Sequence, residues 1–261
     1  MKKILIFITG FLFIASSCQK KDEATPQTSG SIEIKFDHFV GNQRFSLNQS
    51  YTNSATNEQF TPTLLKYFVS NFHFIKEDGS SYVVPVEKSY FLIDVKDNSL
   101  QSIRIDSLPA GKYVALEFII GVDSLMSTKE PEQRPSSLDP AGAAQGMYWS
   151  WNPGYIFVKF EGTSPQSPRD GNVFKYHIGG YGGYSTPTIN CIRKRRIDFG
   201  KSVSINGQDT PSVHLIVDIL KFFNGNFSLR IADNPVVMFN PLGTSIADNY
   251  KEMFKLDHIH E

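Results

Sequence analysis

Apolar and polar side chains alternate along the stretch SIEIKFDHFV, residues 31–40. Successive side chains of a β-strand point to opposite faces, so every second residue shares a face. The even-numbered residues on one face are Ile32, Ile34, Phe36 and His38. The stretch therefore predicts a strand with one buried face. Because His38 continues the apolar face, we expect it to point inward.

The same period of two recurs along most of the chain, and turn residues at 77–80 and 108–111 separate neighbouring stretches. Helical patterns are scarce, and residues 246–254 form a candidate short helix. This pattern predicts an all-β fold, an antiparallel β-sandwich with long irregular loops and few short helices. We expect further strands at residues 64–75, 82–86, 90–95, 101–105, 113–120, 155–161, 173–178, 195–199, 212–220 and 227–232.

The N-terminus has the parts of an export signal. Lys2 and Lys3 precede an apolar run over residues 4–14, and small residues follow at 15–17. The apolar run is about 11 residues long, whereas a helix needs about 20 to span a bilayer. We therefore expect residues 1–17 to be a removable signal peptide.

Cys18 directly follows the expected cleavage site, which is typical of bacterial lipoproteins. Lipidation of Cys18 would anchor the mature chain, because several acyl chains together hold a protein at a membrane. The alternative is an ordinary secretory signal with an accidental cysteine. Residues 18–30 are polar, without periodicity, and read as a flexible tether. The expected location is the outer membrane, facing the periplasm or the cell surface.

Residues 31–261 are enough for a single β domain with one core. The formal net charge is +0, so no field recruits nucleic acid. Cys191 is the only other cysteine and has no intramolecular partner if Cys18 is lipidated. We expect Cys191 to be buried and inert, with a soft-metal role as the alternative. Motifs of hydrolases, zinc proteases and nucleotide-binding enzymes are missing, which argues against an enzyme.

Both tryptophans of the chain stand two residues apart, at Trp149 and Trp151. In an extended chain their indoles would share a face, about 6–7 Å apart. They follow a long segment without a period, residues 121–147, and loops of that length are often functional. The alternative is that both are core aromatics, each burying a large area.

Metal-ligand candidates are few. His258 and His260 stand at strand spacing, share a face and are flanked by carboxylates, an arrangement that could bind a transition metal; the alternative is a solvated C-terminus. His214 lies in an apolar strand and is interpreted as structural. Asp123 and Asp139, at the ends of the long segment, form a weaker hypothesis for calcium.

Taken together, these motifs resemble the MbnP-like family, exported copper-binding proteins associated with methanobactin. The resemblance covers essentially the whole mature chain, and the Trp-containing element is its most specific part. The residues that carry it are 36–38 (FDH), 65–71 (LKYFVSN), 109–113 (PAGKY), 121–123 (GVD), 138–140 (LDP), 149–155 (WSWNPGY), 176–179 (YHIG), 217–218 (VD) and 258–260 (HIH).

The resemblance implies a non-enzymatic protein that binds copper, as Cu(I), outside the inner membrane. In the family, a partner di-haem protein of the MbnH type, related to cytochrome c peroxidases, oxidises a tryptophan to kynurenine. By motif position, Trp149 or Trp151 would be modified. His38 and His177 would be metal ligands, with His258 and His260 next. No histidine stands near the tryptophans in the sequence, so the ligands would have to converge through the fold.

A second hypothesis keeps the sandwich fold and drops the metal. The chain would then be a surface interaction or adhesion lipoprotein, with the aromatic motif as core or as a platform for glycans or a partner protein. Geometry separates the two hypotheses. An imidazole within hydrogen-bond reach of an indole favours copper, whereas distant histidines and indoles favour the interaction protein.

Overall fold

The structure is a computed structural model that describes residues 29–149 and 154–261. The expected signal peptide, the expected lipidation site Cys18 and nearly all of the expected tether lie outside the described residues, as does Trp151. The first strand begins at Ser29, slightly before the alternating stretch. Within the described residues, no helix is long and apolar enough to cross a membrane.

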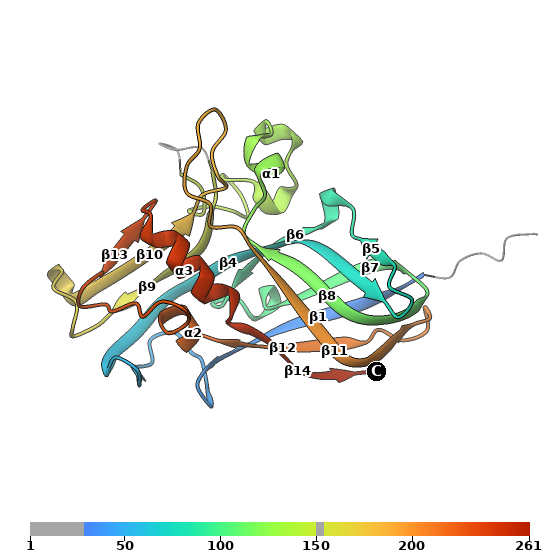
Figure 1. The fold of residues 1–261 in the computed structure, drawn as a ribbon, viewed down its shortest axis with the longest axis horizontal. Helices are drawn as coiled ribbons and strands as arrows, with labels where there is room; N and C mark the ends of the chain where they lie inside the picture. The colour runs from blue at the N-terminus through green and yellow to red at the C-terminus, as the bar shows by residue number, and fades with distance from the viewer. Residues whose placement is uncertain (1–28, 150–153) are drawn as a thin grey trace, which may run out of the picture.

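Two mixed sheets pack into a sandwich (Figure 1). In the first sheet the order is β14-β12-β1-β2, and β7 also pairs with β1. The expected β-sandwich is confirmed, and two of its strand pairs, β1 with β12 and β10 with β13, are parallel. The strands of the first sheet are β1 (Ser29–Val40), β2 (Gln43–Arg44), β7 (Ser102–Pro109), β12 (Ser212–Asp218) and β14 (Phe254–His260).

The second sheet is built on β4, a strand of 19 residues. Its order is β11-β8-β4-β9-β10-β13, and β3, β5 and β6 also pair with β4. Register shifts near Pro62 and Asn71 bend β4, which allows it to pair with different strands along its length. The bounds are β3 (Tyr51–Asn53), β4 (Glu58–Lys76), β5 (Ser81–Val83), β6 (Tyr90–Asp94), β8 (Gly111–Ile120), β9 (Ile156–Thr163), β10 (Val173–Gly179), β11 (Arg193–Ile205) and β13 (Val236–Met238).

Aromatic rings fill the space between the sheets. Phe36 of β1 contacts Tyr67, Phe118 and Phe254 edge-to-face, with ring centroids 6.2–6.4 Å apart. All four side chains are at most 2% exposed. Edge-to-face contacts add to the stabilisation from buried apolar area, so this cluster holds the two sheets together.

Helices are short, and the longest of those described, α3, packs against β10, β11 and β13. The expected helix at 246–254 is found slightly earlier, as α3 (Leu242–Lys251), and the chain is already a strand at Phe254. The other helices are α1 (Ser124–Thr128), α2 (Leu220–Phe223) and the 3₁₀ turns Val86–Lys88, Asn98–Leu100, Pro131–Gln133, Ser136–Leu138 and Asp170–Asn172.

The strand expected at residues 227–232 is wrong. Side chains satisfy this backbone instead of a ladder. The buried Asn249 amide accepts from the Phe227 N–H and donates to the Phe227 carbonyl. The buried Glu58 carboxylate accepts from the N–H groups of Ile231 and Ala232. Such bonds replace strand pairing for buried backbone groups.

Candidate metal centre

Three histidines meet on the outer face of the first sheet, on two neighbouring strands. His214 of β12 lies directly opposite His258 of the antiparallel strand β14. His260 stands two residues further along β14, opposite Ser212. Val213 and Leu215 point into the core, so the alternation of β12 turns His214 outward. Strand parity and register together build this His214–His258–His260 cluster.

The three rings are close enough to share one ion. One ligand nitrogen from each lies within 4.8 Å of the others. The rings of His214 and His258 are stacked, with centroids 4.3 Å apart, and the His260 ring stands nearly perpendicular to both. The Nε2 atoms of His258 and His260 are 2.9 Å apart. Within residues 29–149 and 154–261, no other group of three or more His, Cys, Asp or Glu side chains converges in this way.

Carboxylates orient two of these imidazoles. The Nδ1 atom of His214 is 2.8 Å from Oδ2 of Asp37, and Nδ1 of His258 is 2.9 Å from Oδ2 of Asp257. A carboxylate only accepts, so each Nδ1 carries the proton and each Nε2 is left as the basic nitrogen. Nε2 of His258 then accepts from the Nε2–H of His260, a proton that a bound metal ion would replace. A carboxylate on the far nitrogen is the usual support of a metal-binding histidine. The donor set therefore fits a metal ion.

Exposure differs within the cluster. His214 has 15% of its side chain exposed, whereas His258 and His260 are exposed. Imidazole nitrogen suits copper and zinc, and does not suit calcium or magnesium, which prefer oxygen. An accessible site with three nitrogen donors can take up and release an ion without opening the fold.

His38 lies in the core, as the alternation predicted, and both its ring nitrogens are occupied. Its Nδ1–H donates to Oε1 of Gln101 at 3.0 Å, and its Nε2 accepts from the Tyr67 hydroxyl at 2.9 Å. Burial lowers the pKa of His38 to about 4, so the ring is neutral at physiological pH. A metal could bind His38 only if Tyr67 or Gln101 gave up its bond. The structure does not bring His38 to the cluster.

His177 is in the other sheet, on β10, and makes a pair with Glu161. Its Nε2 is 2.6 Å from the Glu161 carboxylate, which leaves Nδ1 as the basic nitrogen. Burial is the main cause that lowers its pKa. The sequence-based prediction that His177 is a ligand stays a prediction, because the structure places His177 with one carboxylate and not with His38.

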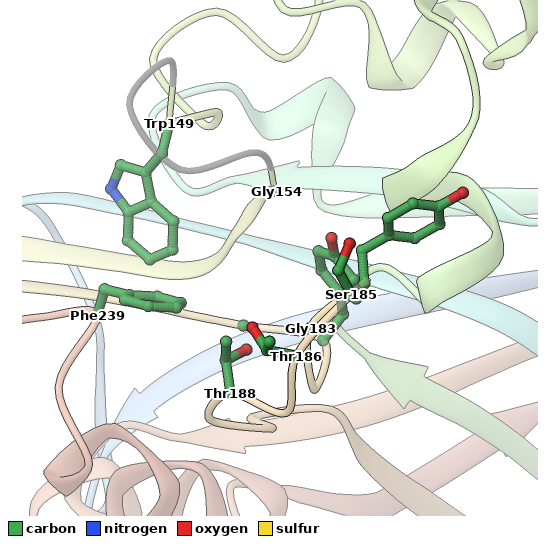
Figure 2. Close-up of a pocket in the computed structure, with 10 residues that line it drawn as sticks. Trp149, Gly154, Gly183, Ser185, Thr186, Thr188 and Phe239 are labelled. Atoms are coloured by element: carbon green, nitrogen blue, oxygen red, sulfur yellow. The ribbon is translucent and has the colours of Figure 1, made fainter.

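Trp149 is 6% exposed and packs edge-to-face on Phe239, with ring centroids 5.7 Å apart. Its six-membered ring covers Gly179, where a Cβ atom would come within 2.9 Å of the indole. It also borders a pocket (Figure 2). Trp149 is thus packed as a core aromatic and also has one edge on a pocket. Both interpretations of the tryptophan pair, as core residues and as part of a functional site, therefore apply to it.

The remaining candidates are engaged elsewhere. Burial raises the pKa of the Cys191 thiol to about 12, so the thiol stays protonated and unreactive. Asp123 caps α1 and accepts from Met126, Asn71 and Tyr90. Asp139 accepts from the Ala141 N–H. The structure does not bring Asp123 and Asp139 into a common cluster of acidic groups.

His214 is the residue that sequence reasoning missed, since it was interpreted as structural. The signal for His258 and His260 was their spacing. For His214 the sequence shows only a polar residue between two apolar ones. Its place beside His258 and His260 follows from the pairing of β12 with β14.

Comparisons with known proteins find one matching family and one similar solved structure. The family model MbnP matches residues 29–239. Among solved structures, MbnP from Methylosinus trichosporium matches with a TM-score of 0.51 and 16% sequence identity, over 75% of this chain and 78% of that chain. At this identity the likeness shows the fold alone. A search of curated proteins gives no match. The matched range contains His38, Trp149, His177 and His214, and ends before β14.

Proposed function

This chain belongs to the MbnP family, and we propose that it is an exported protein, not an enzyme, that binds copper as Cu(I). The observation that carries the proposal is the His214–His258–His260 cluster, with Asp37 and Asp257 on two of its far nitrogens. Imidazole suits copper, and a site of few nitrogen donors favours the reduced ion.

The lipid anchor and the location complete the proposal. Residues 1–17 would be removed and Cys18 lipidated, so that the domain sits on the outer membrane, facing the periplasm or the cell surface. What supports this is the order of positive, apolar and small residues before Cys18. A lipid-anchored protein with an exposed metal cluster would collect copper outside the inner membrane.

The tryptophan part of the proposal concerns Trp149 or Trp151. Either would be oxidised to kynurenine. Cleavage of the indole C2–C3 bond with addition of two water oxygens releases four electrons to a di-haem partner of the MbnH type, and hydrolysis then removes C2 as formate. The edge of Trp149 on a pocket supports access at the first position. The product offers an aromatic amine, a nitrogen donor of the class that copper accepts, which at Trp149 would form a site apart from the His214–His258–His260 cluster.

Copper binding is tested by anaerobic titration of the full chain with Cu(I) against bathocuproine disulfonate. We expect one tightly bound ion, and we expect His258→Ala and His260→Ala each to weaken binding by about 100-fold or more, beyond the 10–100-fold typical of outer-shell changes. His73→Ala, a histidine of the second sheet outside any metal cluster, is the matched control. Equal affinity of all four proteins would refute the cluster as the copper site.

The modification is tested separately, by peptide mass spectrometry of protein purified from its native host. The peptide with Trp149 and Trp151 should carry a mass gain that matches kynurenine. An unmodified peptide from a protein that still binds copper through the cluster would remove the tryptophan part and leave the histidine part standing.

A further inference from the structure

The pocket beside Trp149 is a second site, apart from the His214–His258–His260 cluster. Its volume is about 320 Å³, and it lies between Trp149 and the segment that follows β10. Figure 1 shows β14 and the C-terminus at one end of the molecule, away from the loop after β10. None of the three clustered histidines lines the pocket. The pocket is thus a feature of its own.

One side of the pocket is aromatic and the other carries hydroxyls. Figure 2 shows the indole of Trp149 and the ring of Phe239 on one side, and the side chains of Ser185, Thr186 and Thr188 across from them. Ligand sites typically combine apolar walls with a few placed polar groups. This pocket has both.

Glycines shape the segment that carries the hydroxyls. Gly183 has φ +89°, and a Cβ there would come within 2.0 Å of the Thr186 carbonyl oxygen. Gly180 has φ +116°, and a Cβ there would come within 2.7 Å of the Ile189 carbonyl oxygen. Only glycine tolerates these positions, so the tight turn that presents the hydroxyls is fixed by the sequence.

No charged side chain is among the described residues that line the pocket. An ion would lose its hydration there without a partner of opposite charge, at a cost of several kcal/mol. The pocket therefore selects a neutral ligand. The lining requires one that offers both an apolar face and hydrogen-bonding groups.

The aromatic surface continues beyond the pocket. Tyr184 is 81% exposed, the most exposed of the large hydrophobic side chains in the described part of the chain. Tyr181 and Tyr184 also line an adjoining hollow of about 340 Å³, where the Arg134 guanidinium lies over the Tyr148 ring at 5.4 Å. Two hollows that share a tyrosine wall fit an extended ligand better than a single compact molecule.

We propose that this surface binds a neutral oligosaccharide, with one sugar ring in the pocket against Trp149 and Phe239 and the chain continuing over Tyr184. A sugar ring has an apolar C–H face that packs on aromatic rings, and its hydroxyls exchange hydrogen bonds with serine, threonine and peptide groups. Its lack of charge matches the lining of the pocket beside Trp149, and in the adjoining hollow its hydroxyls would meet the charged groups of Lys129, Glu130 and Arg134. The site shares no residue with the histidine cluster, so sugar binding and copper binding by the cluster are tested separately; Trp149 is the one residue that it shares with the tryptophan part of the proposed function.

Binding is tested by calorimetry of the full chain with a panel of neutral hexasaccharides: maltohexaose, cellohexaose, laminarihexaose and chitohexaose. The fluorescence of Trp149 and Trp151, the only two tryptophans, gives a second reading. We expect at least one sugar to bind and to change the tryptophan emission. Binding of none of the four sugars would overturn the proposal.

Two variants locate the site. Tyr184→Ala removes an exposed ring, so it leaves the fold intact, and it should weaken sugar binding about five- to tenfold. Thr188→Val keeps the shape and removes a hydroxyl, with a similar expected loss. Val83→Ala, another exposed apolar side chain at 53% exposure on β5, should bind as the wild type does. Unchanged affinity in Tyr184→Ala would overturn the site, and the Cu(I) affinity of this variant should equal that of the wild type.

Discussion

Asp37 and His38 are neighbours on β1, yet they serve two opposite faces of the same sheet. His38 points into the core, where Tyr67 and Gln101 occupy both of its nitrogens. Asp37 points outward and holds Nδ1 of His214 in the cluster. Strand alternation thus separates a histidine that is closed to metal from one that keeps a free Nε2 near two others.

The difference teaches that the partners of a histidine decide its use more than its own strand does. Burial lowers the pKa of His38, and its bonds satisfy it as a neutral core residue. His214 has a carboxylate behind it and two imidazoles in front of it. Substitutions of His38 or its partners should therefore change the free energy of unfolding. Substitutions of His214 or its partners should change the affinity for copper.

The largest expected effect is a loss of folding stability in acid, caused by the buried His38. The pKa of His38 is about 4 in the folded protein, against 6.5 as the ordinary value. Between these values the unfolded chain binds the proton and the folded one does not, so stability falls as pH falls from 6.5 to 4. The full loss is about 3 kcal/mol, with no contribution above pH 7.

Urea unfolding of the wild type and His38→Gln across pH 4–8 measures this difference. Glutamine does not titrate, so the stability of the variant should fall by about 3 kcal/mol less over the same range. If stability fell equally with pH in the two proteins, His38 would bind its proton as readily in the folded chain as in the unfolded chain.

The next effect concerns copper. His214→Ala removes one of three nitrogens and should weaken Cu(I) binding by about 100-fold or more, beyond the 10–100-fold typical of outer-shell changes. His38→Gln should leave the affinity unchanged, because His38 lies outside the cluster. Competition titration at pH 7 measures both. A loss of affinity in His38→Gln with His214→Ala unaffected would reverse the comparison.

Sequence reasoning reached what depends on local alternation. It predicted the strand of residues 31–40, the inward direction of His38 and the shared face of His258 and His260, because these follow from a period of two. The sandwich class followed from the number of short strands and turns.

What failed depended on pairings between distant residues. The role of His214 follows from its register with His258, and no local pattern encodes which strands become neighbours. The alternating stretch at residues 227–232 has the pattern of a strand, but Asn249 and Glu58 bind its backbone. Side chains far away in sequence thus override a local β pattern.

A smaller effect on stability tests the hydrogen bonds of His38 in the core. Tyr67→Phe removes the hydroxyl that donates to Nε2 of His38, leaving a buried acceptor unpaired. We expect a loss of about 2 kcal/mol in the free energy of unfolding, with unchanged Cu(I) affinity. Tyr113→Phe is a matched control, because its hydroxyl donates to the Pro109 carbonyl and lies away from any histidine pair. A change in copper affinity in Tyr67→Phe would connect the core to the cluster.

The smallest expected effect is on Cu(I) affinity and concerns Asp37, the carboxylate that orients His214. Asp37→Asn keeps an oxygen that can accept from Nδ1 of His214, but removes the charge that makes the imidazole a better donor to metal. We expect Cu(I) affinity to fall by about tenfold, at the lower end of outer-shell changes. Glu33→Gln is the matched control, since Glu33 lies on the same face of β1 and bonds Ser102. Equal losses in the two variants would indicate a general effect of surface charge, whereas a loss confined to Asp37→Asn would assign the orienting role to this one carboxylate.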